Sequence, residues 1–158
     1  MKLSTAVMGA AVAAVIAATG TIGTPTASAD TKVTTFGTWE RLRDANGAVI
    51  TAWNIYDLEP SDDTIPEYPL AGTLWEASAA VMPIRGTVTP IIPNLNARTD
   101  SGQNYRVLWQ AYAPNGISGE TLSQGDKSKG EIYFDVSGPP PTKVVYNNGV
   151  EDLIVWQN

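Results

Sequence analysis

From residue 30 onward, apolar and polar residues alternate over short runs that are separated by turn-forming residues. The runs are rich in Val, Ile, Thr, Tyr and Trp, and clusters of Gly, Asn, Asp and Pro punctuate them. A two-residue period is typical of β-strands with one buried face, and no segment sustains a 3.6-residue helical period. The pattern predicts an all-β sandwich with strands near residues 34–42, 48–58, 72–84, 86–92, 103–113, 130–137, 142–147 and 152–157.

The alternation is clearest in residues 105–111, where the odd positions are apolar. This parity predicts that Trp109 is buried, and the run 75–81 predicts the same for Trp75. Small residues in the run 75–81 also indicate that the two sheets approach closely there. In residues 131–136, three apolar residues alternate with two carboxylates and a tyrosine, so one face of this strand is expected to be solvated.

The segment Gly138-Pro139-Pro140-Pro141 has no backbone N–H at its three prolines. It cannot complete a β-ladder inside a sheet, so the sequence predicts an extended crossover between strands.

The N-terminus indicates export. Lys2 is followed by an uninterrupted apolar run from Ala6 to Ala18, which is shorter than the roughly 20 apolar residues of a membrane span and suits a signal peptide. Small residues before Asp30 predict cleavage between Ala29 and Asp30. We therefore expect residues 1–29 to be a cleaved signal peptide, residues 30–158 to form one secreted, extracellular domain, and no stable membrane anchor to remain.

The amino-acid composition limits the classes of partner and the kinds of catalytic chemistry that the domain could have. Removing Lys2 leaves nine basic against sixteen acidic side chains, and an acidic surface repels nucleic acid. The chain has neither Cys nor His, so the domain must fold without a disulfide. The same absence excludes Ser-His-Asp and Cys-His nucleophiles, zinc bound by imidazole or thiolate, and thiol redox chemistry. No cofactor and no metal site is expected.

One carboxylate pair has a spacing that could serve glycoside hydrolysis. Asp57 and Glu59 would lie about 6–7 Å apart on one face of a strand, within the separation that such enzymes use. The alternative is that both are ordinary solvated carboxylates at the end of a strand. The whole acidic segment 57–67 could also offer oxygen ligands to Ca²⁺, but it lacks the EF-hand spacing and also suits a solubilising surface.

Tryptophan side chains are the other candidate binding groups, because an exposed indole face stacks on sugar rings and marks a site. Trp39, Trp53 and Trp156 have ambiguous strand parity. They are the candidates for an exposed binding face, although core packing is the favoured interpretation of each.

Several fragments in the later part of the chain resemble a known family. They are Tyr68-Pro69-Leu70-Ala71-Gly72, Arg85-Gly86-Thr87-Val88-Thr89-Pro90, Asn96-Ala97-Arg98-Thr99, Asn104-Tyr105-Arg106-Val107-Leu108-Trp109-Gln110, Ile132-Tyr133-Phe134-Asp135-Val136 and Asn147-Asn148-Gly149-Val150-Glu151-Asp152-Leu153. Their order and spacing over about residues 50–158 resemble the small immunogenic secreted antigens of mycobacteria. Residues 30–49 are less distinctive.

The resemblance implies an immunoglobulin-like antiparallel β-sandwich of about 7–9 strands without the usual disulfide, and no established enzymatic activity. Residues 100–105 also resemble the turn that precedes a tyrosine corner, with one extra residue, so the Tyr105 hydroxyl is expected to bond a nearby backbone group.

The function expected from these observations is a non-catalytic binding module for host or cell-envelope proteins or glycans. A glycan-binding or glycan-hydrolysing domain that uses surface Trp with Asp57 and Glu59 is the alternative. The sequence leaves the ligand and the oligomeric state open.

Overall fold

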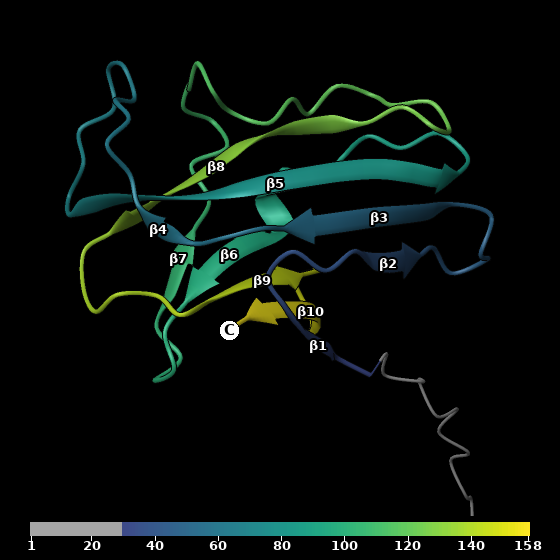
Figure 1. Cartoon of the computed structure of the whole chain (residues 1–158), viewed down its shortest axis with the longest axis horizontal. Coiled ribbons are helices and arrows are strands. Elements are labelled where there is room, and N and C mark those ends of the chain that lie inside the picture. Colours follow the sequence, from purple (N-terminus) through teal and green to yellow (C-terminus); the bar gives the residue numbers. More distant parts are fainter. Residues whose placement is uncertain (1–29) are drawn as a thin grey trace, which may run out of the picture.

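The computed structural model describes residues 30–158 of the chain. These residues fold into two five-stranded β-sheets (Figure 1). The predicted signal peptide and its cleavage point before Asp30 involve residues 1–29, which lie outside the described residues. The first sheet has the strand order β1 (Lys32–Thr35), β10 (Asp152–Gln157), β9 (Lys143–Asn147), β6 (Leu95–Arg98) and β7 (Asn104–Arg106).

The second sheet is built around one long strand, β5 (Thr73–Arg85). Strand β8 (Ser128–Val136) pairs along one edge of β5, and β3 (Ile50–Ile55) and β4 (Glu59–Pro60) pair along the other. Strand β2 (Glu40–Arg43) pairs outside β3. All pairings are antiparallel except that of β1 with β10. The predicted all-β sandwich is confirmed.

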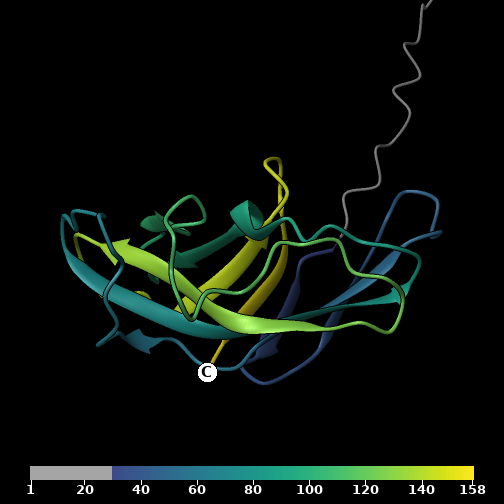
Figure 2. The same ribbon diagram turned by 90° about the horizontal axis from the view of Figure 1, so that it is seen from above.

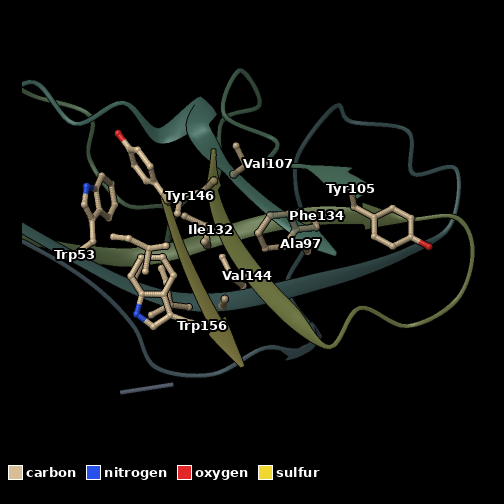
Figure 3. Packing of buried hydrophobic residues seen from close by; sticks show 14 of the residues in the cluster. Trp53, Ala97, Tyr105, Val107, Ile132, Phe134, Val144, Tyr146 and Trp156 are labelled. Atoms are coloured by element: carbon tan, nitrogen blue, oxygen red, sulfur yellow. The ribbon is translucent and has the colours of Figure 1, made fainter. Parts of the chain in front are cut away.

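The core lies between the inner faces of the two sheets (Figure 3). Alternate residues of β5 are small there, and Ala77 and Ala79 are completely buried on the inner face of the sheet. Large side chains fill the remaining space, and because the chain has no disulfide, their burial carries the stability. The largest fully buried residues include Trp53, Trp156, Phe134, Ile55, Leu95, Ile132 and Ile154.

Three predicted strands differ from the structure. The run 34–42 divides at Gly37, whose φ of +87° turns the chain from β1 in one sheet to β2 in the other. The run 86–92 is not a strand, and it leads instead into a short 3₁₀-helix, η1 (Ile92–Asn94), with Pro93 inside it. The run 103–113 stops being a strand at Arg106.

The proline segment 138–141 connects β8 in one sheet with β9 in the other, which confirms the predicted crossover. It also receives the Tyr105 hydroxyl, which donates a 2.8 Å hydrogen bond to the carbonyl of Pro139. The predicted bond to backbone is therefore present, but it joins two distant segments. The tyrosine-corner prediction was wrong, because the acceptor lies 34 residues away and not in the turn before the tyrosine.

The outer face of β8 is not fully solvated, contrary to the prediction. Tyr133 is only 3% exposed and packs with Ile65 and Leu74 in a second apolar cluster. Tyr68 from the connection before β5, and Leu108, Ala111 and Ala113 from the connection that runs beside β8, pack on this cluster (Figure 2). Alternation within the strand gives no sign of these connections.

Candidate functional site

The five tryptophans follow the prediction only in part. Trp53 and Trp156 are 1% and 0% exposed in the core, so the favoured interpretation of core packing is confirmed for both and neither is an exposed binding face. Trp39 is half-buried, with the Lys127 ammonium 5.6 Å from the centre of its ring. Trp75 is half-buried, whereas Trp109, which was predicted to be buried, is 54% exposed.

Trp109 is exposed because it belongs to a loop and not to a strand. We call residues 107–117 the aromatic loop. It runs along the free edge of β8 and is held there at both ends: the Leu108 N–H donates to the Tyr133 carbonyl at 2.8 Å, and the Ile117 N–H donates to the Glu131 carbonyl at 2.9 Å. The loop thereby covers an edge that would otherwise be open to pairing with another chain.

Close approach of the aromatic loop to β8 depends on Gly130. A Cβ atom at this position would lie 2.6 Å from the Ile117 nitrogen and 2.8 Å from the Gly116 carbonyl carbon. Only glycine lets the two backbones come this near, so the sequence of β8 sets the position of the loop.

Beneath the aromatic loop lies a concave surface that we call the aromatic cavity, with a volume of about 390 Å³. Trp109 and Tyr112 belong to its wall, and they are 54% and 76% exposed. Its remaining lining includes Ile92, Val107, Leu108, Gln110, Ile117, Glu131, Ile132 and Tyr133. The cavity therefore combines flat aromatic faces with an amide and a carboxylate, an arrangement suited to binding a ligand that has both apolar faces and polar groups.

Glu131 is the acidic group of the aromatic cavity. Partial burial raises the pKa of its carboxyl, and the nearby charges of Glu76, Asp57 and Asp63 raise it further, whereas hydrogen bonds from the Ser78 hydroxyl act in the opposite direction. The Ser78 oxygen lies 2.9 and 3.1 Å from the two carboxylate oxygens. This side is acidic, so it favours a neutral or cationic ligand over an anionic one.

Asp63 connects the acidic segment 57–67 to the same face. Its carboxylate accepts a 2.5 Å hydrogen bond from the Tyr133 hydroxyl and a 3.0 Å bond from the Asn115 side chain in the aromatic loop. These two bonds lower the pKa of Asp63, and burial together with Asp63 raises the pKa of Tyr133. The acidic segment is thus a structural cover of the sheet, fixed by its carboxylates.

Asp57 and Glu59, the predicted carboxylate pair, are both exposed. Asp57 accepts a 2.8 Å hydrogen bond from the backbone N–H of Ser78, and Glu59 lies in the two-residue strand β4. Neither carboxylate lines the aromatic cavity or the concave surface that contains Trp75. The structure therefore does not bring this pair together with an aromatic binding surface.

Within residues 30–158, no three His, Cys, Asp or Glu side chains converge in a way that could hold a metal ion. Over the same residues, no helix has the length and apolar character that a membrane span requires.

The profile of a protein family described as a domain of unknown function (DUF1942) matches residues 31–156. The chain belongs to this family. Its sequence is 48% identical to the immunogenic protein MPT63 of Mycobacterium tuberculosis and to the immunogenic protein MPB63 of Mycobacterium bovis, over 99% of this chain and 99% of each relative.

A solved structure agrees with the fold. The crystal structure of MPT63, described as a secreted protein from M. tuberculosis, superposes with a TM-score of 0.77 at 50% identity and covers 84% of this chain and 99% of its own. The resemblance to immunogenic mycobacterial antigens and the expected secreted location are both confirmed. These relatives are named as immunogenic proteins and not as enzymes.

Proposed function

We propose that the domain is a non-catalytic, secreted binding module that engages host or cell-envelope partners through the aromatic cavity. The observation that carries the proposal is the exposure of Trp109 and Tyr112 beside a concave surface. Large aromatic side chains provide much of the binding energy in recognition surfaces and are costly to leave in water.

Backbone hydrogen bonds hold the aromatic loop in one position, which supports the proposed binding role. Hydrogen bonds from Leu108 and Ile117 to β8 hold both of its ends, and Asn115 accepts from the Glu131 N–H at 2.8 Å. A loop that is already ordered loses less conformational entropy when it binds, so its aromatic side chains are well placed to act as anchors.

A glycan is the second candidate partner, and one observation favours it. Gln110 and Glu131 line the same cavity as Trp109 and Tyr112, so hydrogen-bonding groups lie beside the aromatic faces. Sugar rings present this same combination of apolar faces and hydroxyl groups. Glycan hydrolysis by Asp57 and Glu59 has less support, because both carboxylates lie outside the aromatic cavity.

The test is to immobilise the secreted protein and to measure the capture of host surface proteins and of envelope glycans by the unaltered chain and by a Trp109→Ala, Tyr112→Ala variant. The variant is expected to lose at least about 2 kcal/mol of binding free energy, the usual cost of removing a central aromatic anchor. Val150→Ala is the matched control, because Val150 is 90% exposed and lies outside the aromatic cavity. A partner that binds the double variant as well as the unaltered chain would contradict this use of the cavity.

A further inference from the structure

A second concave surface opens between the two sheets, away from the aromatic loop. We call it the end cavity, and its volume is about 440 Å³. It lies where the hairpin of β2 and β3, the segment 87–91 after β5, and the β9–β10 hairpin meet. Its lining is Leu42, Arg43, Asp44, Val49, Thr51, Trp53, Thr87, Val88, Thr89, Pro90, Ile91, Asn94, Tyr146, Asn148 and Leu153.

The inner wall of the end cavity is part of the core. The rings of Trp53 and Tyr146, which come from β3 and β9 in opposite sheets, lie 5.8 Å apart at an interplanar angle of 49° (Figure 3). Further out the wall is aliphatic, with half-buried Leu42 and Leu153 on either side. Ile91 belongs to the same lining and is 53% exposed. Apolar side chains therefore make up about half of the lining, and the volume of the end cavity is within the range of about 300–1,000 Å³ that is typical of small-molecule sites.

Two charged side chains, Arg43 and Asp44, belong to the lining of the end cavity. Arg43 is exposed at the end of β2, and its guanidinium has no hydrogen bond or ion pair with any other side chain in residues 30–158. The neighbouring Asp44 carboxylate is engaged, because it accepts a hydrogen bond from the Val49 N–H at 3.2 Å. The Arg85 guanidinium donates to the Gly47 carbonyl in the same hairpin. The β2–β3 hairpin carries Glu40, Arg41, Arg43 and Asp44, and with Arg85 bonded to it the cations outnumber the anions, in a protein whose overall charge is negative.

We propose that the end cavity binds a single-chain amphiphile with an anionic head. The apolar chain would lie in the end cavity against Leu42, Ile91 and Leu153, with the buried Trp53–Tyr146 pair behind them, and its burial supplies the favourable free energy. The carboxylate or sulfate head would remain at the mouth and accept hydrogen bonds from the Arg43 guanidinium, whose fork of donors matches such an anion. This site is separate from the aromatic cavity, so the proposal does not depend on the function proposed above.

The test compares ligands that share one chain and differ in the head: decanoate, decanol and decyltrimethylammonium, each below its micelle concentration. Affinities are measured by calorimetry with the secreted protein, and the site is located from amide chemical shifts. Decanoate is expected to perturb the amides of Val88, Ile91 and Leu153. It should bind at least about tenfold more tightly than decanol, the ratio given by one charge-assisted hydrogen bond, and the cationic ligand should bind more weakly than both.

Substitutions test separately the contacts of the ligand's apolar chain and those of its charged head. Arg43→Gln should weaken decanoate about tenfold and leave decanol unchanged, because only the charged head contacts the guanidinium. Arg41→Gln is the matched control, since Arg41 lies exposed on the same strand but does not line the end cavity. It should leave both affinities unchanged.

Two further variants obstruct the cavity without changing buried residues. Thr87→Trp fills it from an exposed position, and Ile91→Glu places a negative charge on its exposed lining, so each should abolish decanoate binding. Thermal melts establish that each variant is folded. If one variant does not fold, decanoate binding by the other variant tests the proposal. Shifts confined to other parts of the molecule, equal affinity for the three heads, or an Arg43→Gln variant that binds decanoate normally would overturn the proposal.

Discussion

The indole nitrogen of Trp156 donates a 3.0 Å hydrogen bond to the backbone carbonyl of Thr38. Trp156 is fully buried on β10, and Thr38 lies in the connection that carries the chain from β1 in one sheet to β2 in the other. This bond therefore fixes the point at which the N-terminal segment crosses between the sheets. It also satisfies a polar group of a tryptophan that otherwise contacts only the core.

Replacing Trp156 by Phe should destabilise the domain by about 2 kcal/mol. The substitution leaves the Thr38 carbonyl without its partner, at a cost of about 1–3 kcal/mol, and also leaves a small cavity. Chemical denaturation with the unfolding free energy extrapolated to water provides the measurement. Trp39→Phe is the control, because Trp39 is half-buried, and it should cost less than about 1 kcal/mol. Equal losses for the two variants would show that the hydrogen bond contributes nothing.

The Arg98–Asp152 ion pair should make stability depend on acid pH. Arg98 donates to both oxygens of Asp152, at 2.5 and 3.1 Å, and this guanidinium holds the pKa of the Asp152 carboxyl below its ordinary value of 3.8. Because the pKa is lower in the folded state, the stabilisation is present above pH 3.8 and is lost as the pH falls through the folded value. The pair is partly exposed, so its contribution is about 1 kcal/mol or less.

Asp152→Asn removes this dependence and retains a side chain that can still bond Arg98. Unfolding free energies measured from neutral to strongly acid pH should differ between the two proteins at neutral pH and converge as Asp152 becomes protonated. Curves that stay parallel across that range would contradict the assignment of the shift to Arg98.

Glu131 should have the opposite effect on stability. Burial and the neighbouring carboxylates raise the pKa of Glu131 above its ordinary value of 4.5, so this side chain ionises more readily in the unfolded chain than in the folded one. Its favourable contribution is complete below pH 4.5 and is lost as the pH rises through the folded pKa. Glu131→Gln should therefore raise the melting temperature at neutral pH, and the gain should vanish in acid.

The neutral glutamine keeps an oxygen that can accept from the Ser78 hydroxyl, so packing changes little. Thermal melts of both proteins over a pH series give the measurement. Asp135→Asn is a useful comparison on the same strand, because the Asp135 carboxylate accepts from the Ala71 and Gly72 N–H groups at 2.8 Å and its loss should destabilise. A melting temperature that is lower for Glu131→Gln than for the unaltered chain at neutral pH would refute the predicted sign.

Two-residue alternation predicts the fold class here because both sheets have one face in the core. It does not predict where a strand stops. β7 ends at Arg106, where the chain leaves its partner β6 and turns to β8: Val107 forms an isolated bridge with Phe134, and the Leu108 N–H donates to the Tyr133 carbonyl. The apolar odd positions continue to Trp109 nevertheless, and the pattern therefore placed an exposed side chain in the core.

The alternation of residues did not predict the candidate site either. Which face of a strand is buried depends on what covers it, and Tyr133 is buried by loops that come from distant parts of the chain. The turn residues Pro114, Asn115 and Gly116 were the available signal that residues near Trp109 form a loop. The residues around Trp53 and Trp156 do not distinguish these tryptophans from surface residues, because their burial results from the packing of one sheet on the other.

Gly130 offers the sharpest test of how the fold positions the candidate site. A Cβ at this residue would overlap the backbone of Gly116 and Ile117, so Gly130→Ala must push the aromatic loop away from β8. We expect a loss of about 1–3 kcal/mol in unfolding free energy, the usual cost of overpacking, and a larger relative loss of partner binding. Gly119→Ala is the matched control, because its Cβ would meet only the Ile92 side chain at 3.4 Å.

Amide hydrogen exchange measures the displacement directly. In Gly130→Ala the N–H groups of Leu108 and Ile117, which donate to β8, should exchange faster than in the unaltered chain, while those of β9 and β10 should keep their protection. If both N–H groups remain as protected as before and partner capture is unchanged, then the aromatic loop does not depend on its contact with β8. The side chains of Trp109 and Tyr112 would in that case owe their position to the loop itself and not to the strand beside it.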